Sequence, residues 1–180
     1  EVDQSVQTNE LDSAYFAQQK ADSLLELGLY EQAFNNYLIA NWQFKDKQKE
    51  ASITYNNLQI ANIYLSIGDP NSAQELLTQE LTTIQTQTND FKVFLYNALA
   101  NCYVELNDYA LANKYYTLSL DLASNKQAKA IIQNNIALNK IVLKEYDSAI
   151  AILQELNNSN VLQDVPLEHA RILNNLGKAQ

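Results

Sequence analysis

The chain of 180 residues contains no methionine, one cysteine, one histidine, two prolines and three glycines. A single cysteine, Cys102, excludes an intramolecular disulfide and a cysteine-rich metal site. The only histidine, His169, is distant from Cys102 in sequence, and neither residue is accompanied by a carboxylate pair or a phosphate-binding glycine loop. We therefore expect a protein that is not an enzyme, with no catalytic residues, no metal site and no cofactor.

Long hydrophobic runs are also missing, and the charge is mostly of one sign. No apolar stretch approaches the ~18 residues of a membrane helix, so we expect no membrane insertion by this segment. The formal net charge is −9, which disfavours nucleic acid and favours a neutral or cationic partner. The lysine cluster at Lys45, Lys47 and Lys49 is interrupted by Asp46, and it predicts only a solvated helix end.

The ends of the sequence suggest a part of a longer, processed protein, because the chain starts at Glu1 without a methionine and stops within a repeat. Residues 1–10 are polar and aperiodic, and they predict an N-terminal linker. The composition is compatible with the cytoplasm and with bacterial export or the periplasm. Sequence beyond Gln180 would show whether an output domain follows.

What the chain does contain is an internal repeat. Pairs of alanines twelve residues apart recur at intervals of 40, 39 and 37 residues: Ala21 and Ala33, Ala61 and Ala73, Ala100 and Ala112, Ala137 and Ala149. A small residue at two set places in each period lets two helices pack closely, as in a stack of helix pairs. Gly177, which lies 40 residues after Ala137, begins an incomplete fifth unit. These nine residues are the expected structural anchors.

A turn signal stands five residues before the second alanine of each pair: Gly28, Gly68, Asn107 and Lys144. Glycine and asparagine tolerate the left-handed conformation that ends a helix, whereas Lys144 departs from this chemistry. Asp69 and Asp108 are the expected N-caps of the helices that follow. The pattern predicts helices at residues 11–27, 31–46, 49–67, 70–87, 91–106, 109–123, 127–143, 147–157 and 166–179.

The alanine pairs, the turn residues and the residue one turn after each second alanine (Tyr37, Leu77, Tyr116, Leu153) resemble the tetratricopeptide repeat family. The resemblance implies an all-α, right-handed superhelical solenoid of antiparallel helix pairs with about four and a half repeats over residues 11–180. Its units are approximately 14–47, 54–88, 93–125, 130–160 and the incomplete 170–180. Because the units exceed the usual ~34 residues, they are similar to long-repeat members found in bacterial signalling and regulatory proteins.

In that family the first helix of each unit lines a concave groove. The resemblance implies that the peptide-binding residues are Tyr55, Leu58, Asn62, Phe94, Asn97, Asn101, Ile131, Asn134, Leu138, Arg171, Asn174 and Lys178. A carboxamide both donates and accepts hydrogen bonds, so a ladder of asparagines can pair with an extended peptide while apolar neighbours supply pockets. The groove of the first three units has no basic residue, which argues against a clamp for a terminal carboxylate.

The leading hypothesis is therefore a non-catalytic scaffold whose groove binds a protein or an extended peptide. One alternative is the sensory or regulatory domain of a bacterial two-component or transcriptional regulator whose output domain is absent from this chain. Another is a structural oligomerisation segment. The last helix carries Leu167, Ile172, Leu173 and Leu176 without a partner helix of its own, which predicts self-association through this open C-terminal helix.

Overall fold

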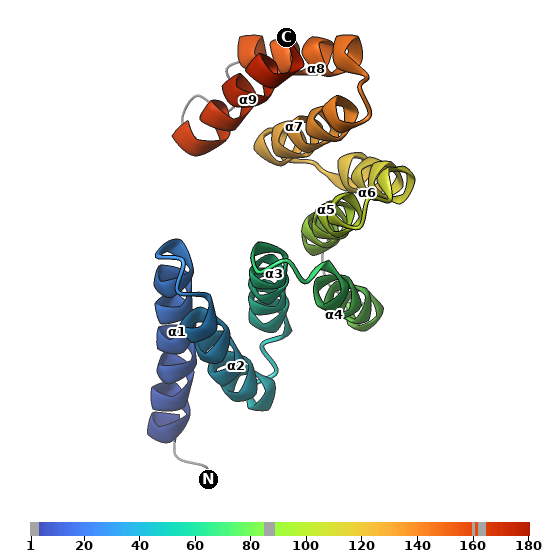
Figure 1. Ribbon diagram of the computed structural model, residues 1–180. Helices are drawn as coiled ribbons and strands as arrows, with labels where there is room; N and C mark the ends of the chain where they lie inside the picture. The colour runs from blue at the N-terminus through green and yellow to red at the C-terminus, as the bar shows by residue number, and fades with distance from the viewer. Residues whose placement is uncertain (1–3, 85–88, 160, 162–164) are drawn as a thin grey trace. The chain divides into compact units, whose positions relative to one another are not determined.

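The computed structural model describes residues 4–84, 89–159, 161 and 165–180. Within these ranges the secondary structure is entirely helical (Figure 1). The helices are α1 (Gln4–Glu26), α2 (Tyr30–Asp46), α3 (Glu50–Ser66), α4 (Pro70–Thr83), α5 (Asn89–Glu105), α6 (Tyr109–Leu122), α7 (Lys126–Val142), α8 (Tyr146–Ser159) and α9 (Pro166–Ala179). The expected all-α class is confirmed.

The start of α1 departs from the prediction. Residues 4–10, assigned to a linker by their polar composition, belong to this helix, while residues 1–3 lie outside the described part of the chain. The physical reason is that residues 4–10 contain no glycine or proline, so nothing in the sequence stops the helix that the packed residues further along have nucleated. The polar composition of residues 4–10 therefore did not predict where α1 begins.

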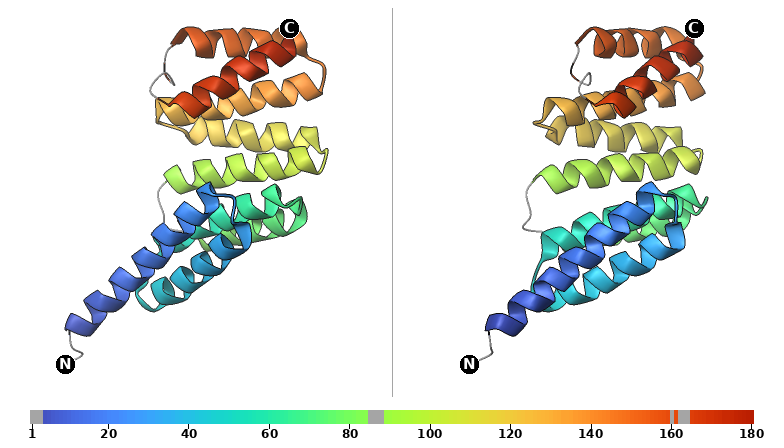
Figure 2. Two further views of the ribbon diagram at one scale, coloured as in Figure 1. Left: turned by 60° about the vertical axis from the view of Figure 1, so that its left-hand side comes forward. Right: turned by 90° about the vertical axis from the view of Figure 1, so that its left-hand side faces the viewer.

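The chain divides into two compact units, Glu1–Gln87 and Thr88–Gln180. In unit 1, α1 packs on α2, α2 on α3 and α3 on α4. In unit 2, consecutive helices from α5 to α9 pack in the same way, and α7 also contacts α5 and α9 (Figure 2). Sequential packing of helix pairs confirms the helical-repeat fold, whereas the domain limits and the handedness of the superhelix stay predictions.

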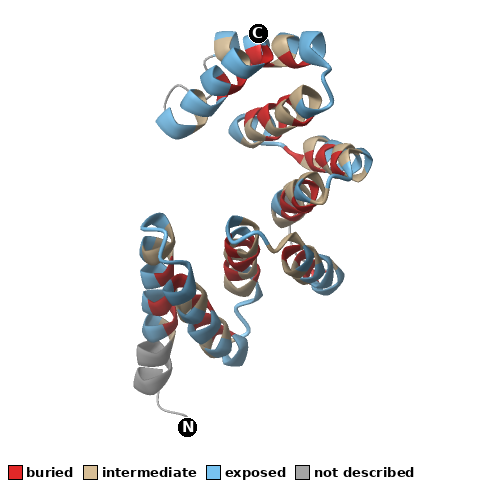
Figure 3. Cartoon of the chain, in the orientation of Figure 1, coloured by how far each residue is buried: buried red, intermediate tan, exposed pale blue. Residues whose placement is uncertain are grey.

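All eight alanine anchors are completely buried, with 0% of their surface exposed. Ala21 and Ala33 pack in one cluster with Tyr37, and Ala100 and Ala112 pack in another with Tyr116. Figure 3 shows the buried residues in red along the helix faces that meet within each unit. A side chain of one carbon at these points lets neighbouring helices approach closely, which the repeat requires.

Gly177 does not behave as a ninth anchor. It is exposed, and no atom lies within 4 Å of the place that a Cβ would occupy. The other anchors are buried because a second helix packs on them, and in the described part of the chain no helix covers Gly177. The spacing of small residues in the sequence continues into α9, but the close helix contact seen at the other anchors is not made at Gly177.

The four turns within the helix pairs share one geometry. Gly28, Gly68, Asn107 and Lys144 have positive φ angles of 72°, 80°, 60° and 62°. The residue after each donates its backbone N–H to the carbonyl five residues earlier, as in the 2.8 Å bond from Asp108 to Tyr103. The repeat therefore imposes the left-handed conformation even on Lys144, whose side chain disfavours it.

The predicted caps are also present. The side chain of Asp69 accepts a hydrogen bond from the backbone N–H of Ser72 at 3.1 Å, and Asp108 accepts one from Leu111 at 3.0 Å. The bonds from Ser72 lower the pKa of the Asp69 carboxyl below its ordinary value. Each cap satisfies a donor in the first turn of a second helix.

Candidate functional site

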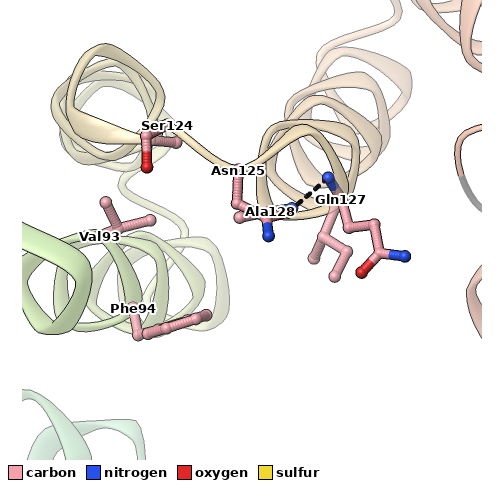
Figure 4. Close-up of a pocket in the computed structure, with 8 residues that line it drawn as sticks. Val93, Phe94, Ser124, Asn125, Gln127 and Ala128 are labelled. Carbon is pink, nitrogen blue, oxygen red and sulfur yellow. Dashed lines mark hydrogen bonds between the residues drawn. The ribbon is translucent and has the colours of Figure 1, made fainter.

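A pocket of about 450 Å³ lies in unit 2 between α5 and the start of α7 (Figure 4). It is lined by Val93, Phe94, Ala123, Ser124, Asn125, Gln127, Ala128 and Ile131. None of these side chains is charged, and most of them are apolar. Such a lining suits an uncharged apolar group, with a few polar atoms at the edge to orient it.

Helix α5 directs two consecutive residues to different environments. Val93 belongs to the buried core of unit 2, whereas Phe94 is 51% exposed at the pocket. Adjacent residues on a helix point about 100° apart, so one can pack inward while the next meets solvent. Core packing at Val93 thereby fixes the position from which the Phe94 ring reaches the pocket.

The α6–α7 connection forms the opposite wall. Asn125 is the N-cap of α7, and its Oδ1 accepts hydrogen bonds from the backbone N–H groups of Gln127 at 2.7 Å and Ala128 at 3.2 Å. These bonds hold the first turn of α7 in place, and Gln127 and Ala128 of that turn line the pocket. Of the predicted groove residues, the structure brings Phe94 and Ile131 together here.

The pocket also contains residues that the groove prediction missed. Ser124, Asn125 and Gln127 belong to the connection and to the first turn of α7, and positions counted from an alanine anchor do not reach them. The Ser-Asn pair before Lys126 was a usable signal, because serine and asparagine favour helix N-caps.

The predicted asparagine ladder is largely engaged in bonds within unit 2. Asn97 Oδ1 accepts a hydrogen bond from Asn135 at 3.0 Å, and Asn101 Oδ1 accepts one from the Tyr116 hydroxyl at 2.6 Å. Asn134 is only 3% exposed, and its Oδ1 accepts a bond from Asn175 at 3.1 Å. The structure therefore gives Asn134 a packing role in place of the expected ligand contact, because a buried carboxamide must find partners inside the protein.

The remaining predicted groove residues of unit 2 are spread over α7 and α9. Leu138 is half-buried on α7. Asn174 and Lys178 are exposed on α9, where Arg171 forms a 2.8 Å ion pair with Glu168. None of these residues lines the pocket.

In unit 1 the predicted groove residues face different surroundings. Leu58 is buried in the core, and Asn62 is exposed and donates to the Gln59 side chain at 3.2 Å. Tyr55 donates its hydroxyl proton to Asp22 Oδ1 at 2.9 Å, and Tyr37 donates to the same oxygen at 2.6 Å. One carboxylate oxygen thus joins α1, α2 and α3.

The Asp22 carboxylate and its surroundings keep both tyrosines neutral. Burial first, then the hydrogen bond to Asp22 and its negative charge, raise the pKa of Tyr55 to about 12. The same causes in the same order raise the pKa of Tyr37 even further. Both hydroxyls are therefore donors at neutral pH, with a structural role in unit 1.

A second polar group in unit 1 is buried, and the repeat pattern did not predict it. Glu80 is buried, and its two carboxylate oxygens accept hydrogen bonds from the Thr54 hydroxyl at 2.5 Å and Asn57 Nδ2 at 2.7 Å. Asn41 in turn donates to Asn57 at 2.8 Å and accepts from Asn56 at 2.8 Å. The repeat contained a signal, since the equivalent positions of the other units hold Ala40, Ser119 and Leu156, all buried.

Groups with catalytic or metal-binding chemistry have ordinary structural surroundings. Cys102 is fully buried, and burial raises the pKa of its thiol to about 12, which disfavours the reactive thiolate. A ring nitrogen of His169 lies 3.1 Å from Asn157 Oδ1. In the described ranges, no cluster of three or more His, Cys, Asp or Glu residues has the geometry of a metal site.

None of the helices described above is both long and apolar enough to cross a membrane.

Comparison with known proteins supports the repeat. Residues 95–126 match the tetratricopeptide repeat family. No curated protein sequence matches the chain significantly. The TPR-like repeats of a kinesin light chain-like protein from Podosopora anserina share 16% identity and a TM-score of 0.67, covering 92% of this chain and 84% of that one.

Two crystal structures of MamA are similar to a lesser degree. The first has a TM-score of 0.54 and 16% identity, and covers 93% of this chain and 90% of its own. The second has a TM-score of 0.51 and 17% identity, and covers 88% and 91%. At such identities the likeness shows the fold alone. The resemblance to the tetratricopeptide repeat family is thereby confirmed, while the likeness to bacterial signalling members stays a prediction.

Proposed function

We propose that this chain, which contains a tetratricopeptide repeat, is a non-catalytic scaffold that binds an extended peptide or a partner helix on the face formed by α5 and α7. The observation that carries the proposal is the uncharged pocket with Phe94 half exposed beside it and Ile131 in its wall. A preformed hollow with a mostly apolar lining and a few polar groups is the usual form of a ligand site, and Phe94 offers an exposed aromatic ring there.

Polar groups next to the pocket can orient the ligand. Asn97 lies one helical turn after Phe94, and its bond with Asn135 uses one lone pair of the acceptor and one proton of the donor. A carboxamide has two protons and two lone pairs, so each asparagine keeps hydrogen-bonding capacity. We infer a ligand segment with an apolar side chain in the pocket and backbone amides over the Asn97–Asn135 pair. The uncharged lining favours a neutral side chain at this point.

A peptide selected from a random twelve-residue phage-displayed library on the wild-type protein provides the probe. Its affinity, measured by fluorescence anisotropy, should fall at least tenfold in Phe94→Asp, because the substitution places a charge at an apolar pocket. Leu118→Asp is the matched control, since Leu118 is an exposed apolar residue on α6 that does not line the pocket. Selection of no peptide, or equal losses in the two variants, would contradict the proposal.

A role as an oligomerisation segment is favoured by one feature of α9. Ile172 is buried and Leu176 is half-buried against the core of unit 2, which leaves Leu167 and Leu173 exposed. Self-association through this face should appear in sedimentation velocity as a concentration-dependent species that Leu173→Asp removes. A single species at every concentration would rule out this role for the chain.

A further inference from the structure

The charge of the chain is divided very unequally between its units. Unit 1, residues 1–87, contains four lysines and twelve Asp or Glu residues, a formal charge of −8. Unit 2, residues 88–180, contains eight Lys or Arg and nine Asp or Glu residues, a formal charge of −1. Nearly all of the net negative charge of the chain therefore belongs to unit 1, and net charge steers the approach of charged partners.

Unit 1 also exposes a group of large apolar side chains. Trp42, the only tryptophan, is 70% exposed on α2, and Phe16 on α1 is 68% exposed. Leu38 and Ile39, on α2 near Trp42, are each about half exposed. We call these four residues the α1–α2 patch. Tryptophan is the residue most enriched at binding hot spots, and grouped exposed apolar residues mark interaction surfaces.

Three contacts fix how α1 and α2 lie along each other. Gln43 donates to the Ser13 hydroxyl at 3.2 Å, the Tyr15 and Phe44 rings pack with centroids 4.9 Å apart, and Tyr37 bonds to Asp22. These pairs run in opposite directions along the chain, so the helices are antiparallel. Along the hairpin axis, Phe16 thus lies at the level of residues 40–43.

The spacing within α2 makes the patch a ridge. Leu38 and Trp42 are four residues apart and Ile39 and Trp42 are three apart, so the three side chains lie along one face. The buried face of the same helix consists of Ala33, Tyr37, Ala40 and Phe44 (Figure 3). An apolar ridge of this spacing is the surface that another helix packs against.

Charged residues distinguish the two ends of the patch. Glu26 and Glu31 are exposed at the end where α1 finishes and α2 begins. At the other end, Lys45 and Asp46 are exposed side by side, and Lys49 follows in the connection to α3. The Glu26 and Glu31 end is therefore acidic, while the opposite end carries both signs.

We propose that the α1–α2 patch docks a basic amphipathic helix of a partner protein. The apolar face of that helix covers Phe16, Ile39 and Trp42, and its lysines or arginines lie toward Glu26 and Glu31. Apolar burial supplies the affinity, while the charge of −8 on unit 1 steers a cationic partner and repels anionic membranes. The same charge opposes pairing of this surface with a second copy.

Trp42 reports directly on the proposal, because no other tryptophan contributes to the fluorescence. The probes are two synthetic eighteen-residue peptides with the same leucine face, one with lysine and one with glutamate on the polar face. The Leu–Lys peptide should shift Trp42 emission to shorter wavelength in a saturable manner, and the Leu–Glu peptide should not. A similar response to both peptides would overturn the charge argument.

Variants tested by anisotropy of a labelled Leu–Lys peptide separate this surface from general attraction to an acidic protein. Trp42→Ala should weaken binding at least tenfold and Glu31→Lys at least threefold. The control Glu155→Lys changes an exposed carboxylate of unit 2 by the same charge and should leave affinity within twofold. Equal effects of Glu31→Lys and Glu155→Lys would overturn the proposal. So would a Trp42 shift caused by phosphatidylserine vesicles or by raising the protein concentration alone.

Discussion

Asn135 on α7 donates its Nδ2 proton to Asn97 Oδ1 on α5 at 3.0 Å. Asn175 on α9 repeats this relationship with Asn134 on α7 at 3.1 Å. In both pairs the donor stands two residues before the first anchor of its unit, and the acceptor three before the first anchor of the preceding unit. These asparagines connect the first helices of successive repeats. From the residue pattern alone, Asn97 and Asn134 were predicted to contact a ligand.

Asn175→Ala tests the buried pair. It leaves Asn134 Oδ1 without its partner, and an unpaired buried acceptor costs about 1–3 kcal/mol in the free energy of unfolding. Asn174→Ala is the neighbouring control, because Asn174 is exposed and its removal should change stability by less than ~0.5 kcal/mol. Urea denaturation of the two variants decides the matter. Equal losses would show that the bond adds nothing to stability.

Glu80→Ala should destabilise unit 1 by about 1–3 kcal/mol, because the buried Thr54 hydroxyl and the partly buried Asn57 amide lose their acceptor. Glu75→Ala, an exposed change on the same helix, is the control. Replacing Thr54 by valine and Glu80 by leucine, the residues found at the equivalent positions of other units, should recover part of the loss. Failure of this recovery in urea melts would show that the site cannot accept an apolar core.

Ala112→Leu should lower stability by about 1–3 kcal/mol, because it inserts bulk at a fully buried helix contact. Ala110→Leu makes the same chemical change two residues earlier on an exposed face of α6 and should have little effect. Thermal unfolding followed by circular dichroism compares them. Similar melting temperatures would mean that the anchor does not limit the helix approach.

Lys144→Gly should stabilise unit 2 by up to ~1 kcal/mol, because the residue has φ of 62° and a Cβ is strained in that region. Lys129→Gly serves as the opposite control, since within the regular helix α7 glycine costs about 1 kcal/mol. Chemical denaturation gives both values. A loss of stability in Lys144→Gly would indicate that the lysine side chain contributes more than its backbone strain removes.

Alkaline pH should weaken unit 1 through Tyr37 and Tyr55. Their folded pKa values are raised, to about 12 for Tyr55, so the stability they contribute is present below the unfolded value near 10 and is lost as pH rises. Urea midpoints measured between pH 8 and pH 11 should fall less steeply in the Tyr37→Phe, Tyr55→Phe double variant. Tyr146→Phe, which removes the hydroxyl of an exposed tyrosine at the start of α8, is the control. Identical slopes would exclude the Asp22 cluster as the cause.

The helices, the eight alanine anchors and the turns followed from the sequence, because each depends on residues close together in the chain, whereas Gly177 did not become an anchor. Helix ends were predicted within a few residues wherever glycine, proline, aspartate or asparagine marked them. The predicted start of α1 was wrong, since residues 4–8 contain no glycine, proline, aspartate or asparagine to mark it. Lys144 is the opposite case. Its position in the repeat predicted a left-handed turn, although its side chain does not favour one.

The roles of the polar side chains depended on tertiary structure. Phe94 and Ile131 were predicted groove residues and line one pocket, whereas Leu58, predicted in the same way, is buried in the core of unit 1. The partner of an asparagine depends on which groups the next repeat places within hydrogen-bonding distance, and the partners of Asn97 and Asn134 are 38 and 41 residues away. The periodic sequence determined where the helices and their contacts lie. Only the packing of the repeats decided which polar side chains bond to one another and which surface is left for a partner. The reason is that a hydrogen bond requires a short distance between two groups, and no single helix specifies that distance.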